Sequence, residues 1–171
     1  LLEQRGPHLV GHARKVADVA RRIAVAMKVD EKTTGDIFIA GLLHDVGQMG
    51  LSDLLLSKPV PKMNDEELKY RMRRLRGEQS LMALEDLHDV SVLIRSHHER
   101  VDGHGFPDRL SGEAIPLGAR ILAVAETYDD LQSGHLGSAG ATPSEARMLI
   151  ERGQGTQFDP EVVSVFLSLF S

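Results

Sequence analysis

The chain has 171 residues, of which 42% are hydrophobic and 26% charged, and its formal net charge at pH 7 is −5. This length suits a single domain with a hydrophobic core of its own. The lack of cysteine excludes disulfides and thiolate metal sites, so any metal must bind to histidine, aspartate or glutamate. A negative net charge argues against a DNA partner, which requires a basic surface. No apolar run is long enough to span a bilayer, and we expect a cytoplasmic protein.

The first two predicted helices follow from the spacing of apolar residues. One runs from Pro7 to Lys28, with apolar side chains at steps of three and four residues. Asp30 is the expected N-cap of the second, which runs from Glu31 to Val46 with Gly47 as its C-cap. The second helix is apolar nearly all round, which indicates a central place in the core.

Further helices are expected beyond a connector that contains two prolines. Asn64 begins one helix, another runs from Val90 to His98, and a third runs from Pro116 to about Leu131. Thr142 and Asp159 each precede a proline and an acidic residue, a pattern typical of a helix start. No stretch alternates with period two, so the predicted fold class is all-α, with about six to eight helices.

Several histidines and acids stand where a metal could bind. The His44-Asp45 pair ends the apolar second helix, where a buried carboxylate needs a strong partner to stay ionised. His97-His98 offers two adjacent imidazoles, which suit several divalent metals. His8 and His12 lie one turn apart and share a helix face. A polar surface would place histidines in the same way, so this alternative stays open.

The segment after His98 is rich in glycine and charge. Residues 99–107 are Glu-Arg-Val-Asp-Gly-His-Gly-Phe-Pro, in which the glycines allow a sharp bend and Pro107 stops any preceding helix. We expect the loop from Gly103 to Pro107 to serve a site or a partner rather than the core. Farther on, Glu126 directly follows an apolar run in the helix that is expected to start at Pro116, so its carboxylate is a further candidate ligand.

The string HHERVDGHGFP at residues 97–107, downstream of His44-Asp45-Val46-Gly47, resembles the HD-GYP family of metal-dependent phosphohydrolases. The resemblance extends through residues 119–125, Tyr128-Asp129 and residues 155–160, and thus over nearly the whole chain. It implies one HD-type helical bundle around a metal site, over residues 1–171. It also implies hydrolysis of cyclic di-GMP to pGpG or GMP with one to two divalent ions. Iron or manganese is favoured, and zinc, nickel and magnesium stay open.

The resemblance assigns roles to particular residues of this chain. Asp45 would bridge two ions and act with His44 in catalysis, and His8 lies where a third ion is held in some members. The implied metal ligands are His8, His12, His44, Asp45, His97, His98 and Glu126. The implied substrate contacts are Gln48, Arg76, Arg100, Asp102, Gly103 and Phe106.

Five positions depart from the family pattern. Arg76 stands where a ligand histidine is usual, and arginine stays protonated and cannot bind a metal. Gln48 replaces a phosphate-binding lysine, and the segment that begins at His135 replaces a substrate-binding Arg-Pro-Tyr-Arg. Glu126 and Phe106 replace aspartate and tyrosine. The alternative prediction is therefore a degenerate domain with little or no activity that serves as a metal-containing ligand-binding or protein-interaction module.

The expected partners follow from the same resemblance. Cyclic di-GMP would be the ligand, and domains of the GGDEF type would be protein partners. The chain begins with Leu-Leu-Glu rather than methionine, so we expect the C-terminal part of a longer signalling protein with an upstream regulatory domain. A dimer stays open.

Overall fold

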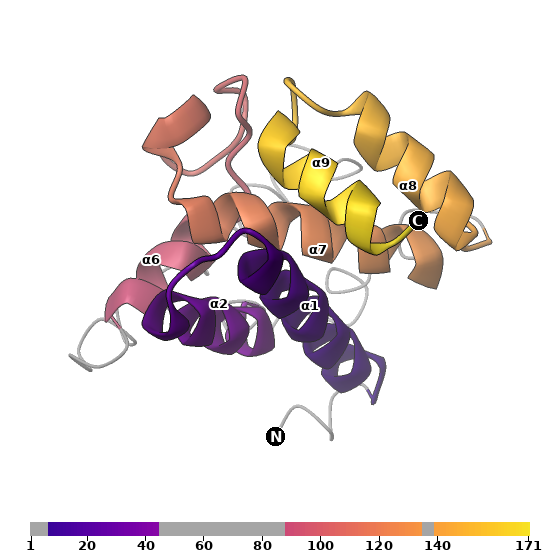
Figure 1. Ribbon diagram of the computed structural model, residues 1–171, viewed down its shortest axis with the longest axis horizontal. Helices are drawn as coiled ribbons and strands as arrows, with labels where there is room; N and C mark the ends of the chain where they lie inside the picture. Colours follow the sequence, from indigo (N-terminus) through magenta and orange to yellow (C-terminus); the bar gives the residue numbers. More distant parts are fainter. Residues whose placement is uncertain (1–6, 45–87, 135–138) are drawn as a thin grey trace.

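The computed structural model describes residues 7–44, 88–134 and 139–171, with side chains from residue 11 onward (Figure 1). These ranges hold six α-helices and one short 3-10 helix, and no strand, which confirms the predicted all-α class. The elements are α1 (Pro7–Ala26), α2 (Glu31–Leu43), α6 (His88–Ser96), η4 (Gly112–Ala114), α7 (Leu117–Ser133), α8 (Pro143–Arg152) and α9 (Pro160–Leu169). Among the described helices, none has the length and apolar character needed to cross a membrane.

Helix α7 is the central element of the bundle. In Figure 1 it runs through the middle, with α1 and α2 on one side and α8 and α9 on the other, and it contacts all five of the other described α-helices. Its buried residues include Ile121, Leu122, Val124 and Ala125. Because α7 is covered on several sides, Glu126 in the same stretch is buried.

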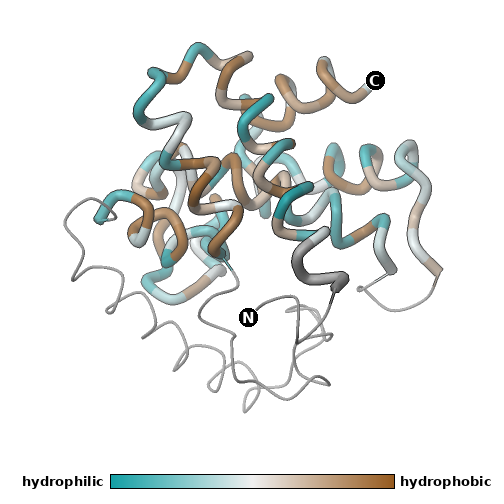
Figure 2. Tube along the Cα trace, turned by 90° about the horizontal axis from the view of Figure 1, so that it is seen from below, coloured by the Kyte–Doolittle hydropathy of each residue, from teal (hydrophilic) through white to brown (hydrophobic). Residues whose placement is uncertain are grey.

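The core combines residues from both ends of the chain. Hydrophobic and hydrophilic positions alternate in short runs along the helices, as expected for helices with one buried face (Figure 2). Burial of one aliphatic or aromatic side chain stabilises the fold by about 1.5–3 kcal/mol. Fully buried contributors from α1 and α9 are Val16, Ala20, Ile23, Val162, Val163 and Phe166.

Two glycines allow helices to approach closely near the centre of the bundle. A Cβ atom at Gly41 would lie 2.7 Å from the Cα atom of Ala17, so α1 and α2 touch backbone to backbone there. A Cβ atom at Gly118 would lie 2.8 Å from side-chain atoms of both Ile37 and Leu93, where α7 meets α2 and α6. The α1–α2 contact sets the spacing between the helix segments that carry the histidines.

Three of the predicted helix starts, those of α2, α8 and α9, agree with the structure. The side chain of Asp30 accepts a hydrogen bond from the backbone N–H of Thr33 at 2.9 Å and caps α2. Thr142 and Glu145 form a reciprocal capping box at the start of α8. Asp159 accepts from two backbone N–H groups at the start of α9.

Some predicted helix ends were wrong by a few residues. The helix expected at Val90–His98 is α6, which begins at His88 and ends at Ser96. Beyond it the backbone N–H of Glu99 donates to the Ser96 carbonyl, three residues earlier, at 3.0 Å, and the chain turns. Pro116 is the N-cap of α7 rather than its first residue, and α7 continues to Ser133, where Gly134 ends it with φ 77°.

Helix α2 ends at Leu43, with His44 as its C-cap. The predicted continuation to Val46, the cap at Gly47 and the helix from Asn64 lie outside the described residues.

Candidate metal centre

Four histidines and one glutamate converge beside α7. His12 comes from α1, His44 from the end of α2, His97 and His98 from the turn after α6, and Glu126 from α7. All are buried except His98, which is partly buried. The structure thus brings together five of the seven predicted ligands, from four separate segments. Their role as ligands stays a prediction.

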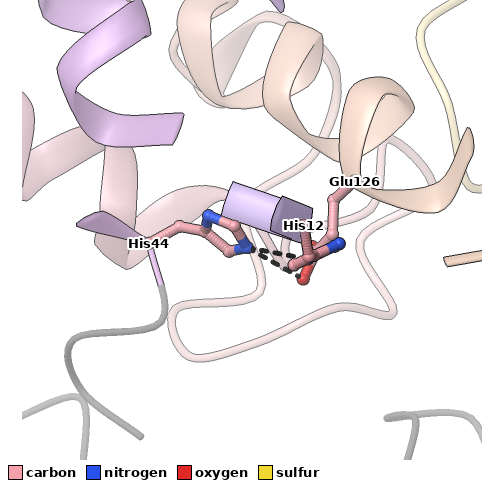
Figure 3. A group of neighbouring side chains, drawn as sticks. All are labelled: His12, His44 and Glu126. Atoms are coloured by element: carbon pink, nitrogen blue, oxygen red, sulfur yellow. Dashed lines mark hydrogen bonds and ion pairs between the residues drawn. The ribbon is translucent and has the colours of Figure 1, made fainter. Parts of the chain in front are cut away.

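The first group consists of His12, His44 and Glu126 (Figure 3). The Nε2 atom of His44 lies 3.3 Å from Nε2 of His12 and 3.7 Å from Oε1 of Glu126. Figure 3 shows the three side chains pointing toward one another. One donor atom from each residue lies within 4.8 Å of the other two.

The second group consists of His97, His98 and Glu126. The Oε2 atom of Glu126 lies 3.6 Å from Nε2 of His97 and 3.8 Å from Nδ1 of His98. The two carboxylate oxygens therefore face different groups, Oε1 toward His44 and Oε2 toward the imidazole pair. Within the described part of the chain, Glu126 is the residue that both groups share.

Hydrogen bonds on the far side of three imidazole rings fix which nitrogen faces the centre. Nδ1 of His44 lies 2.6 Å from the Gly41 carbonyl, and Nδ1 of His97 lies 2.5 Å from the Ile94 carbonyl. A carbonyl can only accept, so both Nδ1 atoms must donate. Nδ1 of His12 lies 2.6 Å from the carboxylate of Asp129 and likewise donates. In each neutral ring the Nε2 lone pair then faces the centre.

These groups fit a divalent cation. In the neutral rings, Nε2 of His12 and Nε2 of His44 are both acceptors at 3.3 Å and cannot bond to each other, so both favour a shared electrophile. Ligand atoms at about 2.0–2.2 Å from one ion lie roughly 3–3.6 Å apart. The separations of 3.3 to 3.8 Å in the structure are close to that spacing. Imidazole with carboxylate is a donor set suited to zinc, iron, manganese or nickel.

Several predicted site residues lie outside the described part. Asp45, Gln48, Arg76 and His135 fall in the undescribed ranges, and the side chain of His8 is likewise outside the description, although its backbone belongs to α1. The bridging role of Asp45 and the effect of Arg76 on a second ion stay predictions.

The glycine-rich loop folds back over the second group. Glu99 is buried, and its carboxylate accepts hydrogen bonds from the backbone N–H groups of Asp108 at 2.6 Å and Leu110 at 3.0 Å. The Phe106 ring stacks on the His98 ring, with centroids 5.1 Å apart and planes inclined by 22°. The loop thereby covers one of the predicted metal ligands.

Two of the predicted substrate contacts pair with each other. Arg100 donates two hydrogen bonds to Asp102, at 3.1 and 2.7 Å. Its guanidinium, together with the backbone N–H of His104, lowers the pKa of Asp102 to about 2. Gly103 follows with φ 81°, a conformation that glycine adopts without strain. The Arg100 charge is therefore already compensated within the loop.

Two buried carboxylates near the site, those of Asp129 and Glu99, were not among the predicted site residues. Asp129 follows Glu126 by three residues, so both lie on one face of α7, and that spacing could have indicated it. Glu99 carried no comparable pattern, because its partners are backbone N–H groups nine and eleven residues away.

Some known proteins resemble this chain in sequence, and others resemble it in structure. The chain is 32% identical over 169 residues to the cyclic di-GMP phosphodiesterase response regulator RpfG of Xanthomonas campestris, covering 97% of this chain and 44% of that protein. It is 28% identical over 161 residues to 3'3'-cGAMP-specific phosphodiesterase 3 of Vibrio cholerae, covering 94% and 35%. The chain thus spans less than half the length of either relative.

The fold matches that of Bd1817, an HDG"Y"P protein from Bdellovibrio bacteriovorus, with a TM-score of 0.77 at 19% identity. That match covers 94% of this chain and 52% of the other. A family model described as an HD domain matches residues 1–162. With imidazole and carboxylate groups gathered beside α7, the chain belongs to the HD domain family, and the predicted resemblance to its HD-GYP members is confirmed.

Proposed function

We propose that this chain is a metal-dependent phosphodiesterase that hydrolyses a cyclic dinucleotide, with cyclic di-GMP as the preferred substrate. The observation that carries the proposal is the pair of imidazole groups that share Glu126. Two neighbouring cation positions are the usual solution for phosphodiester hydrolysis, because a phosphodiester is anionic and resists attack.

The side chains of the centre would act as follows. His12, His44 and Oε1 of Glu126 would hold one ion, and His97, His98 and Oε2 of Glu126 would hold another. When bound, such ions would supply an activated hydroxide and neutralise charge on the phosphoryl oxygens. The fixed Nδ1 hydrogens of His44 and His97 keep each Nε2 lone pair aimed inward, so little reorganisation is needed on binding.

The choice of substrate rests on the relatives and on the charge of the chain. RpfG is a cyclic di-GMP phosphodiesterase, whereas the relative from Vibrio cholerae is specific for 3'3'-cGAMP. Both substrates are cyclic dinucleotides with two phosphodiester groups. Since the net charge of this chain is −5, a dianionic substrate needs a local excess of positive charge, which bound cations would provide. The Arg100 guanidinium could add positive charge there, but it is also hydrogen-bonded to the carboxylate of Asp102.

The test measures metal content and hydrolysis in the same preparations. Protein loaded with manganese or iron(II) should cleave cyclic di-GMP, with 3'3'-cGAMP assayed in parallel. His44→Ala and Glu126→Gln should each lower the rate more than the roughly 10–100-fold typical of losing an outer-shell partner of a metal. The matched controls are His88→Ala and Glu113→Gln, which alter an exposed histidine and an exposed glutamate outside both groups.

Two results would contradict the proposal in different ways. Bound metal without hydrolysis of either dinucleotide would favour the degenerate binding module. Equal metal content in wild type, His44→Ala and Glu126→Gln would refute the assignment of the centre itself.

A further inference from the structure

The three anchored histidines differ in the group that accepts their Nδ1 hydrogen. For His44 and His97 the acceptor is a neutral backbone carbonyl three residues earlier, at 2.6 and 2.5 Å. For His12 the acceptor is the charged carboxylate of Asp129, at 2.6 Å and 117 residues away in sequence. The two groups of the centre are therefore not equivalent, although each contains two imidazoles and shares Glu126.

Asp129 is well placed to act on His12 rather than on solvent. It lies on α7 three residues after Glu126, and its relative exposure is 8%. Lys15 reaches the other carboxylate oxygen only at 3.9 Å, and the side chain of Lys15 is 73% exposed. An exposed ion pair of this kind contributes little to stability, so the hydrogen bond from His12 is the stronger of these two contacts of Asp129.

A carboxylate behind a metal-binding imidazole has two effects. It fixes the tautomer and the ring orientation, which a carbonyl also does, and it makes the ring a stronger electron donor, which a neutral carbonyl does less well. Loss of such a partner typically weakens metal binding by about 10–100-fold. The group that contains His12 should thus hold a cation more tightly than the group that contains His97 and His98.

We propose that Asp129 is a positioning residue that makes the His12–His44–Glu126 group the tighter of the two cation sites, so that this group fills first. This inference rests on the proposed metal centre and adds an order of filling and its cause. Asp129 acts through His12 and is not itself a predicted ligand.

A neighbouring carboxylate allows the hydrogen bond to be separated from charge alone. Oδ1 of Asp130 lies 3.7 Å from the same Nδ1 atom of His12, beyond hydrogen-bond distance. If negative charge near His12 were sufficient, Asp130→Asn would weaken the site as much as Asp129→Asn. If the effect requires a charged acceptor that is hydrogen-bonded to the ring, only the change at Asp129 should matter. Asp18→Asn, at an exposed position of α1, controls for net charge.

The experiment titrates metal-free protein with Mn²⁺ and follows the free ion by electron paramagnetic resonance. Wild type should show a tighter and a weaker class of site. Asp129→Asn should weaken the tighter class by about 10–100-fold and leave the weaker class within about twofold, because the amide oxygen still accepts the hydrogen bond but carries no charge. Asp130→Asn and Asp18→Asn should leave both classes unchanged.

A second readout needs no metal. In wild type, ¹⁵N chemical shifts should show His12 as the tautomer with hydrogen on Nδ1. Asp129→Asn should keep that tautomer, and Asp129→Ala should give a mixture. An unchanged tighter class in Asp129→Asn, or loss from the weaker class instead, would overturn the inference while leaving the proposed function intact. Absence of Mn²⁺ binding by wild type would overturn both.

Discussion

Replacement of Glu99 by alanine should release the glycine-rich loop and destabilise the protein. Glu99 is buried, and its two oxygens accept hydrogen bonds from the backbone N–H groups of Asp108 and Leu110 at 2.6 and 3.0 Å. Both hydrogen bonds join the backbone of the loop to the same buried carboxylate. Without it, two backbone donors lose their partner, and the segment between residues 99 and 110 loses its anchor.

The expected magnitude follows from these two bonds. A hydrogen bond to a charged group contributes about 1.5–3 kcal/mol, and the sum falls to about 2–4 kcal/mol here because water can reach a partly exposed loop. For a protein of this size each kcal/mol shifts the melting temperature by about 2–4 °C, so a fall of about 4–16 °C is expected. Glu99→Gln keeps one acceptor oxygen and should lose about half as much.

Urea and thermal unfolding followed by circular dichroism would measure this loss. The matched control is Glu113→Ala on η4, where an exposed glutamate should change the free energy of unfolding by less than about 0.5 kcal/mol. Mn²⁺ binding by the folded fraction should also weaken at the second group, since the loop carries Phe106 onto His98. Equal unfolding free energies for Glu99→Ala and Glu113→Ala would refute the reasoning.

Phe106→Ala should lower phosphodiesterase activity per folded molecule more than stability, because the ring is partly buried and stacks on His98; a collapse in melting temperature with unchanged activity would instead make it a core residue. Removal of metal with a chelator should lower the melting temperature, since an ion at a hundred times its dissociation constant stabilises by about 2.7 kcal/mol; identical melting curves would contradict a native metal centre. Burial raises the pKa of Asp159, but hydrogen bonds from Arg120 and the first N–H groups of α9 outweigh this and lower it below 3.8. Its stabilising contribution should therefore be complete above about pH 4 and fade as pH falls through the lowered pKa, a dependence that acid unfolding should show in wild type and lose in Asp159→Asn.

Local sequence was enough to predict three helix starts and the residue types that could bind a metal. Asp30, Thr142 and Asp159 cap their helices as predicted, because a cap depends on groups within three residues of one another. The all-α class followed from apolar spacing for the same local reason. The prediction of imidazole and carboxylate as metal ligands likewise came from the His44-Asp45 and His97-His98 pairs and their resemblance to one family.

The way in which these side chains combine into two groups depends on the packing of the helices. The two oxygens of Glu126 face different histidine groups because α7 lies against α1, α2 and α6 at once. The carboxylate behind His12 comes from Asp129, 117 residues away. Helix ends differed from prediction where a turn, rather than the apolar pattern, set the last hydrogen bond, as at Ser96. Contacts between residues far apart in the sequence, such as His12 with Asp129, depend on which helices lie against each other, as α1 and α2 do at Ala17 and Gly41. Local sequence spacing does not encode which helices meet.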